Sequence, residues 1–210
     1  MSPEAPALDE TFAAPATAEQ IDRAAEALRG RNLVVHVVDT IDEARKLVVD
    51  LVPRDQKVFT ATSETLRVSG IAAEIDESGE FESVRAQADE NLGSDVYNVI
   101  RQGSTAEAVV GSVHAVTEDG RLVVASASGS QFAPYAALAR TVIWVVGAQK
   151  VVPDLETALR RVHDYSLPKE WLRLNELAGQ TSFVGKILIV EQEAFPGRGT
   201  VVLVREEIGF

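Results

Sequence analysis

The sequence contains no cysteine, and this absence excludes more than any other feature of its composition. Without thiols, the chain alone cannot form a disulfide, use a thiolate nucleophile, or hold zinc or an iron–sulfur cluster through cysteine. Only three histidines are present and they are far apart, so we expect no dedicated metal site. A chain without cysteine fits a reducing compartment, and we therefore expect a cytoplasmic protein.

Basic residues are also scarce, because 20 Lys and Arg stand against 32 Asp and Glu and the formal net charge is −12. Phosphate binding needs a concentrated basic face, so we expect no nucleic-acid partner. Long apolar runs are absent as well, and we expect no membrane insertion.

The first 17 residues lack both a basic start and an apolar core, so they do not resemble a secretory signal. They are rich in alanine, proline and acidic residues. Such a segment buries too little apolar surface to order itself, which predicts a flexible tail over residues 1–17. The alternative is that this tail docks on a second subunit of a homo-oligomer.

Residues 18–210 predict a single α/β domain, since 46% of the chain is hydrophobic and short β-branched runs alternate with helical patterns. Capping boxes at Thr17 and Thr40 begin two helices, and Gly30 is expected to end the first in a left-handed conformation. The alternation predicts a Rossmann-like open, mostly parallel sheet with helices on both faces. The expected strands cover residues 33–38 (covered on both faces), 57–60, 107–111, 121–126, 141–147, 186–191 and 200–204. Further helices are expected over 95–102, 131–140 and from Pro153 to about Val162.

The segment from Glu74 to Glu90 is strongly acidic, with seven acidic residues against Arg85. This pattern favours a solvated face or loop. The alternative is a contact surface for a partner protein.

Small polar turns follow several of the expected strands and carry the candidate ligand-binding residues. In open parallel sheets, ligands bind at the carboxyl ends of the strands, so these turns are expected to line one cleft. Lys150 follows a buried strand and would balance the charge of an anionic ligand, the alternative being a surface lysine. The candidate ligand-binding residues are Thr62, Ser63, Thr65, Gly111, Ser112, Thr117, Ser126, Ser128, Gly129, Gln131 and Lys150.

Two residues are candidates for acid–base catalysis. Glu118 offers a carboxylate and His114 a group that titrates near neutral pH. For His114 the alternative is a structural, hydrogen-bonded histidine. Asp119 and Gly120 predict a hairpin turn, which would make Glu118 part of the scaffold. GxGxxG, P-loop, HExxH and GxSxG motifs are absent from the sequence, which therefore names no cofactor.

Several blocks resemble the LUD-domain family of lactate-utilisation proteins, also called DUF162. The most specific are the Thr-Glu-Asp-Gly block at residues 117–120 and the Val-Gly-x-x-Lys block at 146–150; the Ser-x-Thr-Leu turn at 63–66 and the segment 185–210 also fit. The resemblance covers roughly residues 18–210. It implies a fold similar to the NagB/RpiA/CoA-transferase superfamily. It also implies a role in oxidising lactate to pyruvate, alongside iron–sulfur and dehydrogenase-like partner proteins.

The chain departs from this family pattern at two places. Many relatives have a cysteine cluster before the strand at 186–191, whereas residues 174–183 contain none. A metal centre is therefore not carried over. Relatives often have Gly-Asn-Arg where this chain has Gly129, Ser130 and Gln131, and the missing arginine removes a fixed positive charge.

Three functions remain open. The first is a metabolic protein that binds a small, anionic metabolite in a cleft at the strand ends. The second is a non-catalytic subunit of a lactate-oxidising complex. The third, by analogy of fold alone, is an enzyme of the isomerase or CoA-transferase type.

Overall fold

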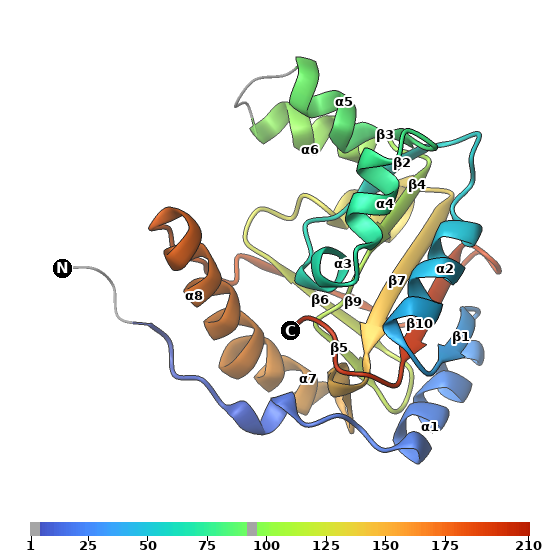
Figure 1. Ribbon diagram of the computed structural model, residues 1–210. Helices are drawn as coiled ribbons and strands as arrows, with labels where there is room; N and C mark the ends of the chain where they lie inside the picture. Colours follow the sequence, from blue (N-terminus) through green and yellow to red (C-terminus); the bar gives the residue numbers. More distant parts are fainter. Residues whose placement is uncertain (1–4, 92–95) are drawn as a thin grey trace.

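Six parallel strands form the main sheet of the computed structural model, which describes residues 5–91 and 96–210 (Figure 1). Every pairing within this sheet is parallel. This architecture confirms the predicted open α/β fold. In spatial order the strands are β1 (Val34–Val38), β10 (Gly199–Val204), β7 (Thr141–Gly147), β4 (Ala108–Gly111), β2 (Lys57–Thr60) and β3 (Glu82–Ser83).

A second, mixed sheet contains two of the strands that were expected in the main sheet. Its order is β8 (Val151–Val152), β5 (Ala115–Thr117), β6 (Leu122–Ser126) and β9 (Lys186–Val190). The predicted turn at Asp119 and Gly120 is confirmed, because β5 and β6 pair antiparallel and Gly120 has a φ of 90°. The prediction of one sheet is wrong, since this reversal and the antiparallel β6–β9 pairing carry both strands into a separate layer.

Side chains alternate between the two faces of the main sheet and build two cores. On one face, Val145 and Val202 pack with α2 (Ile41–Leu51), α3 (Glu64–Val68) and α4 (Ile71–Glu77). On the other face, Trp144 and Leu203 pack with α1 (Ala18–Arg29) and with the second sheet. Helix α7 (Leu155–Arg161) covers the outer side of the second sheet. The second sheet therefore occupies part of a face that was expected to carry only helices.

The start of the chain's first helix follows the predicted capping box. Gln20 N donates to Thr17 Oγ1 at 3.3 Å and Thr17 N donates to Gln20 Oε1 at 3.0 Å. The predicted end is wrong, because Gly30 has a φ of −62° and the left-handed residue is Asn32. The prediction that β1 is covered on both faces holds only in part: Val35 is buried on the side of α1, whereas Val34 on the other face is 39% exposed. β1 is also the edge strand of the main sheet.

Two segments are more helical than expected. The acidic segment folds into α4, β3 and α5 (Val84–Asn91), and its Asp76 accepts hydrogen bonds from the Thr60 and Ser83 hydroxyls. The helix after Pro153 continues beyond Val162 through one wider turn into α8 (Leu167–Ala178). Pro168 follows directly after this wider turn, at the start of α8. Helix α6 (Val96–Ser104) matches the helix expected over 95–102, of which residue 95 lies outside the described residues.

The N-terminal segment differs from the expected flexible tail. Figure 1 shows it running past α7 and α8 toward α1. Asp9 N donates to Asp164 O at 2.8 Å, and Lys169 forms an ion pair with Glu10 at 3.1 Å. Phe12 packs against Tyr165. Residues 5–17 therefore lie on the chain's own domain, and residues 1–4 lie outside the described part.

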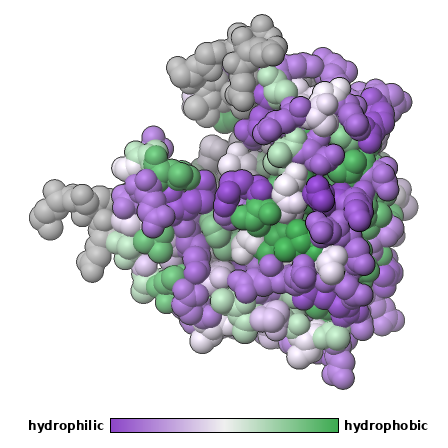
Figure 2. All heavy atoms as spheres, viewed as in Figure 1, coloured by the Kyte–Doolittle hydropathy of each residue, from purple (hydrophilic) through white to green (hydrophobic). Residues whose placement is uncertain are grey.

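The surface drawn in Figure 2 is largely hydrophilic and is interrupted by smaller hydrophobic areas. Within the described residues, no helix is both long and apolar enough to cross a membrane.

Candidate functional site

A cavity of about 320 Å³ opens where strands β2, β4 and β6 end. Each of these strands continues into a polar turn that lines the cavity, at residues 61–64, 112–114 and 126–131. The opposite wall comes from α8 and from residues 182–184. In Figure 1 this region lies between α3 and α8, where the last residue also contributes. Turns that are far apart in the sequence therefore meet at one edge of the fold.

Eight of the sequence-predicted site residues line this cavity: Thr62, Ser63, Ser112, His114, Ser126, Ser128, Gln131 and Lys150. Thr65 lies behind the wall and reaches the site through its hydrogen bond with Lys150. Gly111 and Gly129 determine the shape of the cavity wall. A side chain at Gly111 would collide with the Tyr135 hydroxyl, and Gly129 has a φ of 83°, which favours glycine.

Lys150 lies at the floor of the cavity, at the end of a short helical turn that follows β7. Its side chain is only 1% exposed. Nζ lies 2.8 Å from Thr65 Oγ1, 3.1 Å from Ser112 Oγ and 3.1 Å from Val113 O. None of these three partners carries a charge. Burial, together with the nearby positive charge of Arg161, holds the pKa of Lys150 well below its ordinary value.

Arg161 is a second buried cation, fully enclosed beneath the cavity. It projects from α7 and donates to Gln149 O at 3.1 Å, to His114 O, and to Ser166 Oγ at 3.1 Å. Its Nη2 is buried without a hydrogen-bond partner among the described residues. Burial lowers the pKa of Arg161 to about 10, so the guanidinium remains charged at neutral pH.

His114 lies in the wall of the cavity, and its carbonyl oxygen accepts a hydrogen bond from Arg161. Its Nδ1 accepts a hydrogen bond from Ala125 N at 3.0 Å, so the ring hydrogen of the neutral form is on Nε2. Burial and the charges of Lys150 and Arg161 lower the pKa of His114 to about 3. The ring is therefore neutral near pH 7 and presents a hydrogen-bond donor. The proposed acid–base role loses its basis, because that role depended on titration near neutral pH.

The structure does not bring Glu118 to the cavity. Its carboxylate accepts hydrogen bonds from Gln20 Nε2 at 2.9 Å and Arg23 Nε at 2.8 Å, on helix α1. Partial burial raises the pKa of Glu118, but hydrogen bonds from Arg23 and Gln20 and the charge of Arg23 outweigh this and leave the pKa lowered. Glu118 fastens the β5–β6 hairpin to α1, and we do not include it in the proposed site.

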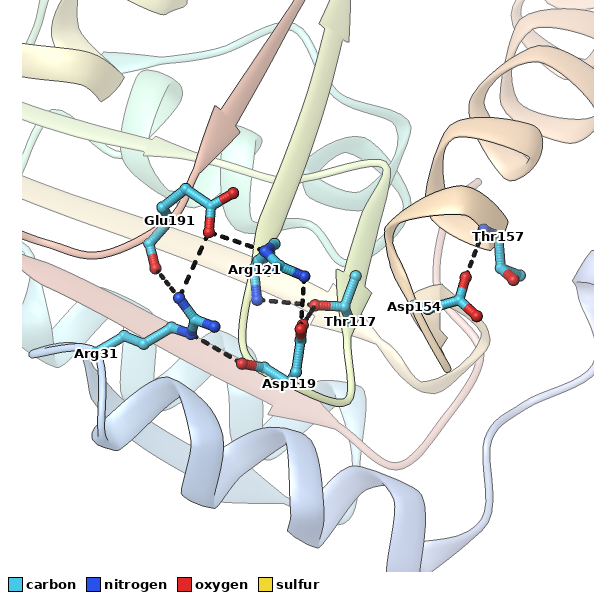
Figure 3. Close-up of polar contacts among 7 residues, drawn as sticks. All are labelled: Arg31, Thr117, Asp119, Arg121, Asp154, Thr157 and Glu191. Atoms are coloured by element: carbon cyan, nitrogen blue, oxygen red, sulfur yellow. Dashed lines mark hydrogen bonds and ion pairs between the residues drawn. The ribbon is translucent and has the colours of Figure 1, made fainter.

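Thr117 is also remote from the cavity. Its hydroxyl bonds to the Asp119 carboxylate and accepts from Arg121 N at 2.9 Å, which closes the hairpin turn (Figure 3). Around this turn, Arg121 pairs with Asp119 at 2.5 Å and with Glu191 at 2.8 Å, and Arg31 Nη1 lies 3.6 Å from Glu191. We call these four residues, Arg31, Asp119, Arg121 and Glu191, the hairpin cluster.

The sequence analysis missed several residues in the wall of the cavity, and Arg161 behind it. Arg161 lies beside Ala158 and Val162, which are buried and apolar. A charged residue among such neighbours was the one feature of the sequence that could have indicated a buried arginine. Glu170 and Arg173, which form an ion pair at 2.7 Å, line the cavity from α8, a helix that was not predicted. Phe183 and Phe210 line it too, although nothing local in the sequence indicates this.

No metal site is evident within the described residues, since they contain no group of three or more His, Cys, Asp or Glu side chains that could hold an ion.

Comparisons with known proteins agree with this architecture. The model of the LUD domain family matches residues 21–204. A crystal structure of a DUF162 family protein from Deinococcus radiodurans has a similar fold, with a TM-score of 0.57 over 89% of this chain and 97% of that chain. The two sequences are 11% identical, so the likeness shows the fold alone. No curated protein matches the sequence.

Proposed function

This chain belongs to the LUD-domain family, related at family level to lactate utilisation, and we propose that it binds a small organic anion in the cavity above Lys150. One observation carries the proposal. Two basic side chains are buried here, Lys150 in the wall of the cavity and Arg161 behind that wall, and the ion pairs found among the described residues include neither of them. Burying a cation without an anionic partner is costly, and a bound anion would supply that partner.

The surrounding groups suit a carboxylate with a neighbouring oxygen. The His114 Nε2–H and the Ser63 and Ser128 hydroxyls provide hydrogen-bond donors around the cavity. The Ser112 and Ser126 hydroxyls already donate to Val145 O and Gln131 Oε1. The remaining walls include Tyr135 and Phe183, so the site combines apolar surface with a few polar groups. A volume of about 320 Å³ lies at the small end of ligand sites, which range from about 300 to 1,000 Å³. Lactate and longer 2-hydroxy or 2-oxo acids fit this description.

Thermal-shift measurements with matched charged and uncharged ligands test the proposal. Lactate, pyruvate and their longer homologues are compared with the corresponding amides, which have the same shape without the charge. We expect the acids to raise the melting temperature in a concentration-dependent way and the amides to have no effect. An equal response to acids and amides, or no response to any acid, would contradict the proposal.

The same measurements separate the other two functions. Stabilisation by CoA esters or sugar phosphates, with none by simple acids, would favour a transferase or isomerase. A flat response to every ligand, together with a co-purifying protein, would favour a non-catalytic subunit of a lactate-oxidising complex. For each of these functions we propose the cytoplasm as the compartment, because a chain without cysteine fits a reducing environment.

A further inference from the structure

Two carboxylates line the cavity, Glu64 from the first turn of α3 and Glu170 from α8. Arg67 Nε and Nη2 donate to the two oxygens of Glu64 at 2.8 and 2.6 Å. Arg173 Nε and Nη2 donate to the two oxygens of Glu170 at 2.7 Å each. Both partners of each pair lie on one helix, so these pairs do not fasten one element to another as the hairpin cluster does. What they fix is the position of each carboxylate in the cavity wall.

The two carboxylates keep part of their capacity to accept hydrogen bonds. An ionised carboxylate has about four acceptor positions, and a two-point arginine pair uses only one on each oxygen. Hydrogen bonds from Arg67, and then the charges of Arg67 and Arg173, hold the pKa of Glu64 below its ordinary value despite partial burial. Because Arg173 acts on Glu64 from α8, both carboxylates border the same part of the cavity.

The turns at the strand ends offer hydroxyl hydrogens to the same space. Thr62, Ser63 and Ser128 line the cavity, and each hydroxyl accepts one hydrogen bond from a neighbouring N–H group, at 3.2, 3.4 and 3.3 Å respectively. Among the residues that the structure describes, none of these three hydroxyls has an acceptor for its own hydrogen. The cavity wall therefore carries both free acceptors and free donors.

We propose that the ligand of this cavity is a polyhydroxylated acid of the sugar-acid class, an inference that rests on the anion site proposed above. The carboxylate of the ligand binds at Lys150, whose Nζ contacts only uncharged oxygens and so lies apart from the wall carboxylates. Hydroxyl groups further along the ligand donate to Glu64 and Glu170. Their oxygens accept from the hydroxyls of the strand-end turns.

The chemistry of the wall distinguishes this ligand from two other kinds of acid. An acid with a single hydroxyl, such as lactate, leaves most of these donors and acceptors without a ligand partner, and sites built to bond hydroxyls discriminate strongly against ligands that lack them. An acid with a second carboxylate brings another negative charge toward Glu64 and Glu170, which disfavours its binding. A chain of hydroxyls supplies donors and acceptors together and adds no charge.

Calorimetric titration of the full chain with four-carbon acids tests the inference. 2-Hydroxybutyrate has one hydroxyl, threonate and erythronate have three, and malate has one hydroxyl and a second carboxylate. We expect threonate or erythronate to bind at least about tenfold more tightly than 2-hydroxybutyrate, and malate to bind no more tightly than 2-hydroxybutyrate. Equal affinities for the four acids, or tightest binding of malate, would overturn the inference and leave the anion site standing. If none of the four acids binds, the anion site itself is overturned.

Two glutamate variants on one helix provide the matched comparison. Glu170→Ala is expected to reduce the preference for the trihydroxylated acids over 2-hydroxybutyrate at least about threefold. Glu176→Ala removes an exposed carboxylate from the same helix and is expected to keep the full preference. Equal weakening of every acid by Glu170→Ala, with the preference retained, would overturn its role as a hydroxyl acceptor. If Glu170→Ala does not fold, the comparison of the four acids on the unaltered protein decides the question.

Discussion

The hairpin cluster and the cavity differ in how their charges are balanced. In the hairpin cluster each cation has a carboxylate partner, and the side chains are partly exposed, at 28% for Arg121 and 58% for Glu191. At the cavity, Lys150 and Arg161 are buried and bond only to hydroxyl and carbonyl oxygens. Each region contains part of a block that resembles the LUD family, from residues 117–120 in the hairpin cluster and from 146–150 at the cavity. Only the second region encloses a cavity.

This difference in charge pairing separates the polar residues that hold the fold together from those that bind a ligand. Exposed ion pairs contribute little individually and hold neighbouring elements in place, as Arg121 and Glu191 do for the hairpin. Buried cations without anionic partners cost stability, so their presence beside a cavity indicates a ligand-binding role. Glu118, paired with Arg23, belongs to the first kind.

The largest expected contrast is between two arginines. Arg161→Met leaves the carbonyls of His114 and Gln149 buried without their donors, and we expect a loss of about 3 kcal/mol in the free energy of unfolding. Arg121→Met removes only partly exposed ion pairs and is expected to cost less than about 1 kcal/mol. Urea denaturation of both variants measures the difference, and equal losses would remove the distinction between the two regions.

The next largest effect is a dependence of stability on pH that arises from His114 at the cavity. The pKa of His114 is about 3 in the folded protein, below the ordinary value of 6.5, so the unfolded chain binds this proton first as the pH falls. The neutral His114 ring therefore makes its full contribution to the free energy of unfolding above pH 6.5. This contribution is lost as the pH falls toward 3. We expect a loss on the order of 2 kcal/mol between pH 7 and pH 4, allowing for partial exposure of the ring.

Histidine variants separate this effect from acid titration elsewhere in the chain. His114→Gln is expected to have a shallower pH dependence than the unaltered protein in urea denaturation. His163→Gln, at an exposed position on the short helix after α7, is expected to keep the full slope. Identical slopes for all three proteins would show that His114 is not held neutral by its surroundings.

A third, smaller effect concerns binding. Lys150→Met keeps the size of the buried side chain but removes its nitrogen, and we expect the Kd of an organic acid to rise at least about tenfold, or ~1.4 kcal/mol. Lys46→Met, at an exposed position on α2, serves as the control and is expected to leave Kd unchanged. Titration calorimetry measures both, and an unaltered Kd for Lys150→Met would separate the lysine from ligand binding.

The smallest effect is expected at the hairpin. Glu118→Gln loses the ion pair with Arg23, whose side chain is 56% exposed, and is expected to cost less than about 1 kcal/mol of stability. Binding of organic acids should not change, because Glu118 does not line the cavity. A tenfold loss of affinity in this variant would restore Glu118 as a site residue.

The sequence predicted those features that depend on local chemistry. Capping boxes at Thr17 and Thr40, the Asp119–Gly120 turn and the polar turns at strand ends all follow from residues close together in the chain. The separate sheet and helix α8 were not predicted, because strand partners and the tolerance of Pro168 are decided by tertiary packing.

The same limit explains the two misjudged polar residues. Glu118 looked like a free carboxylate because its partners, Gln20 and Arg23, are almost a hundred residues away in the chain. Arg161 was not singled out from the sequence, because its burial depends on the packing of α7 against the second sheet. Long-range contacts therefore decide which charges are paired, and the local sequence does not contain them.

A crystal structure of the protein grown with pyruvate or 2-oxobutyrate tests the central claim most directly. The account predicts ligand density in the cavity between α3 and α8, in contact with Lys150 and the His114 ring. Density bound at the hairpin cluster instead, or a cavity without ligand at concentrations that stabilise the protein in solution, would contradict it.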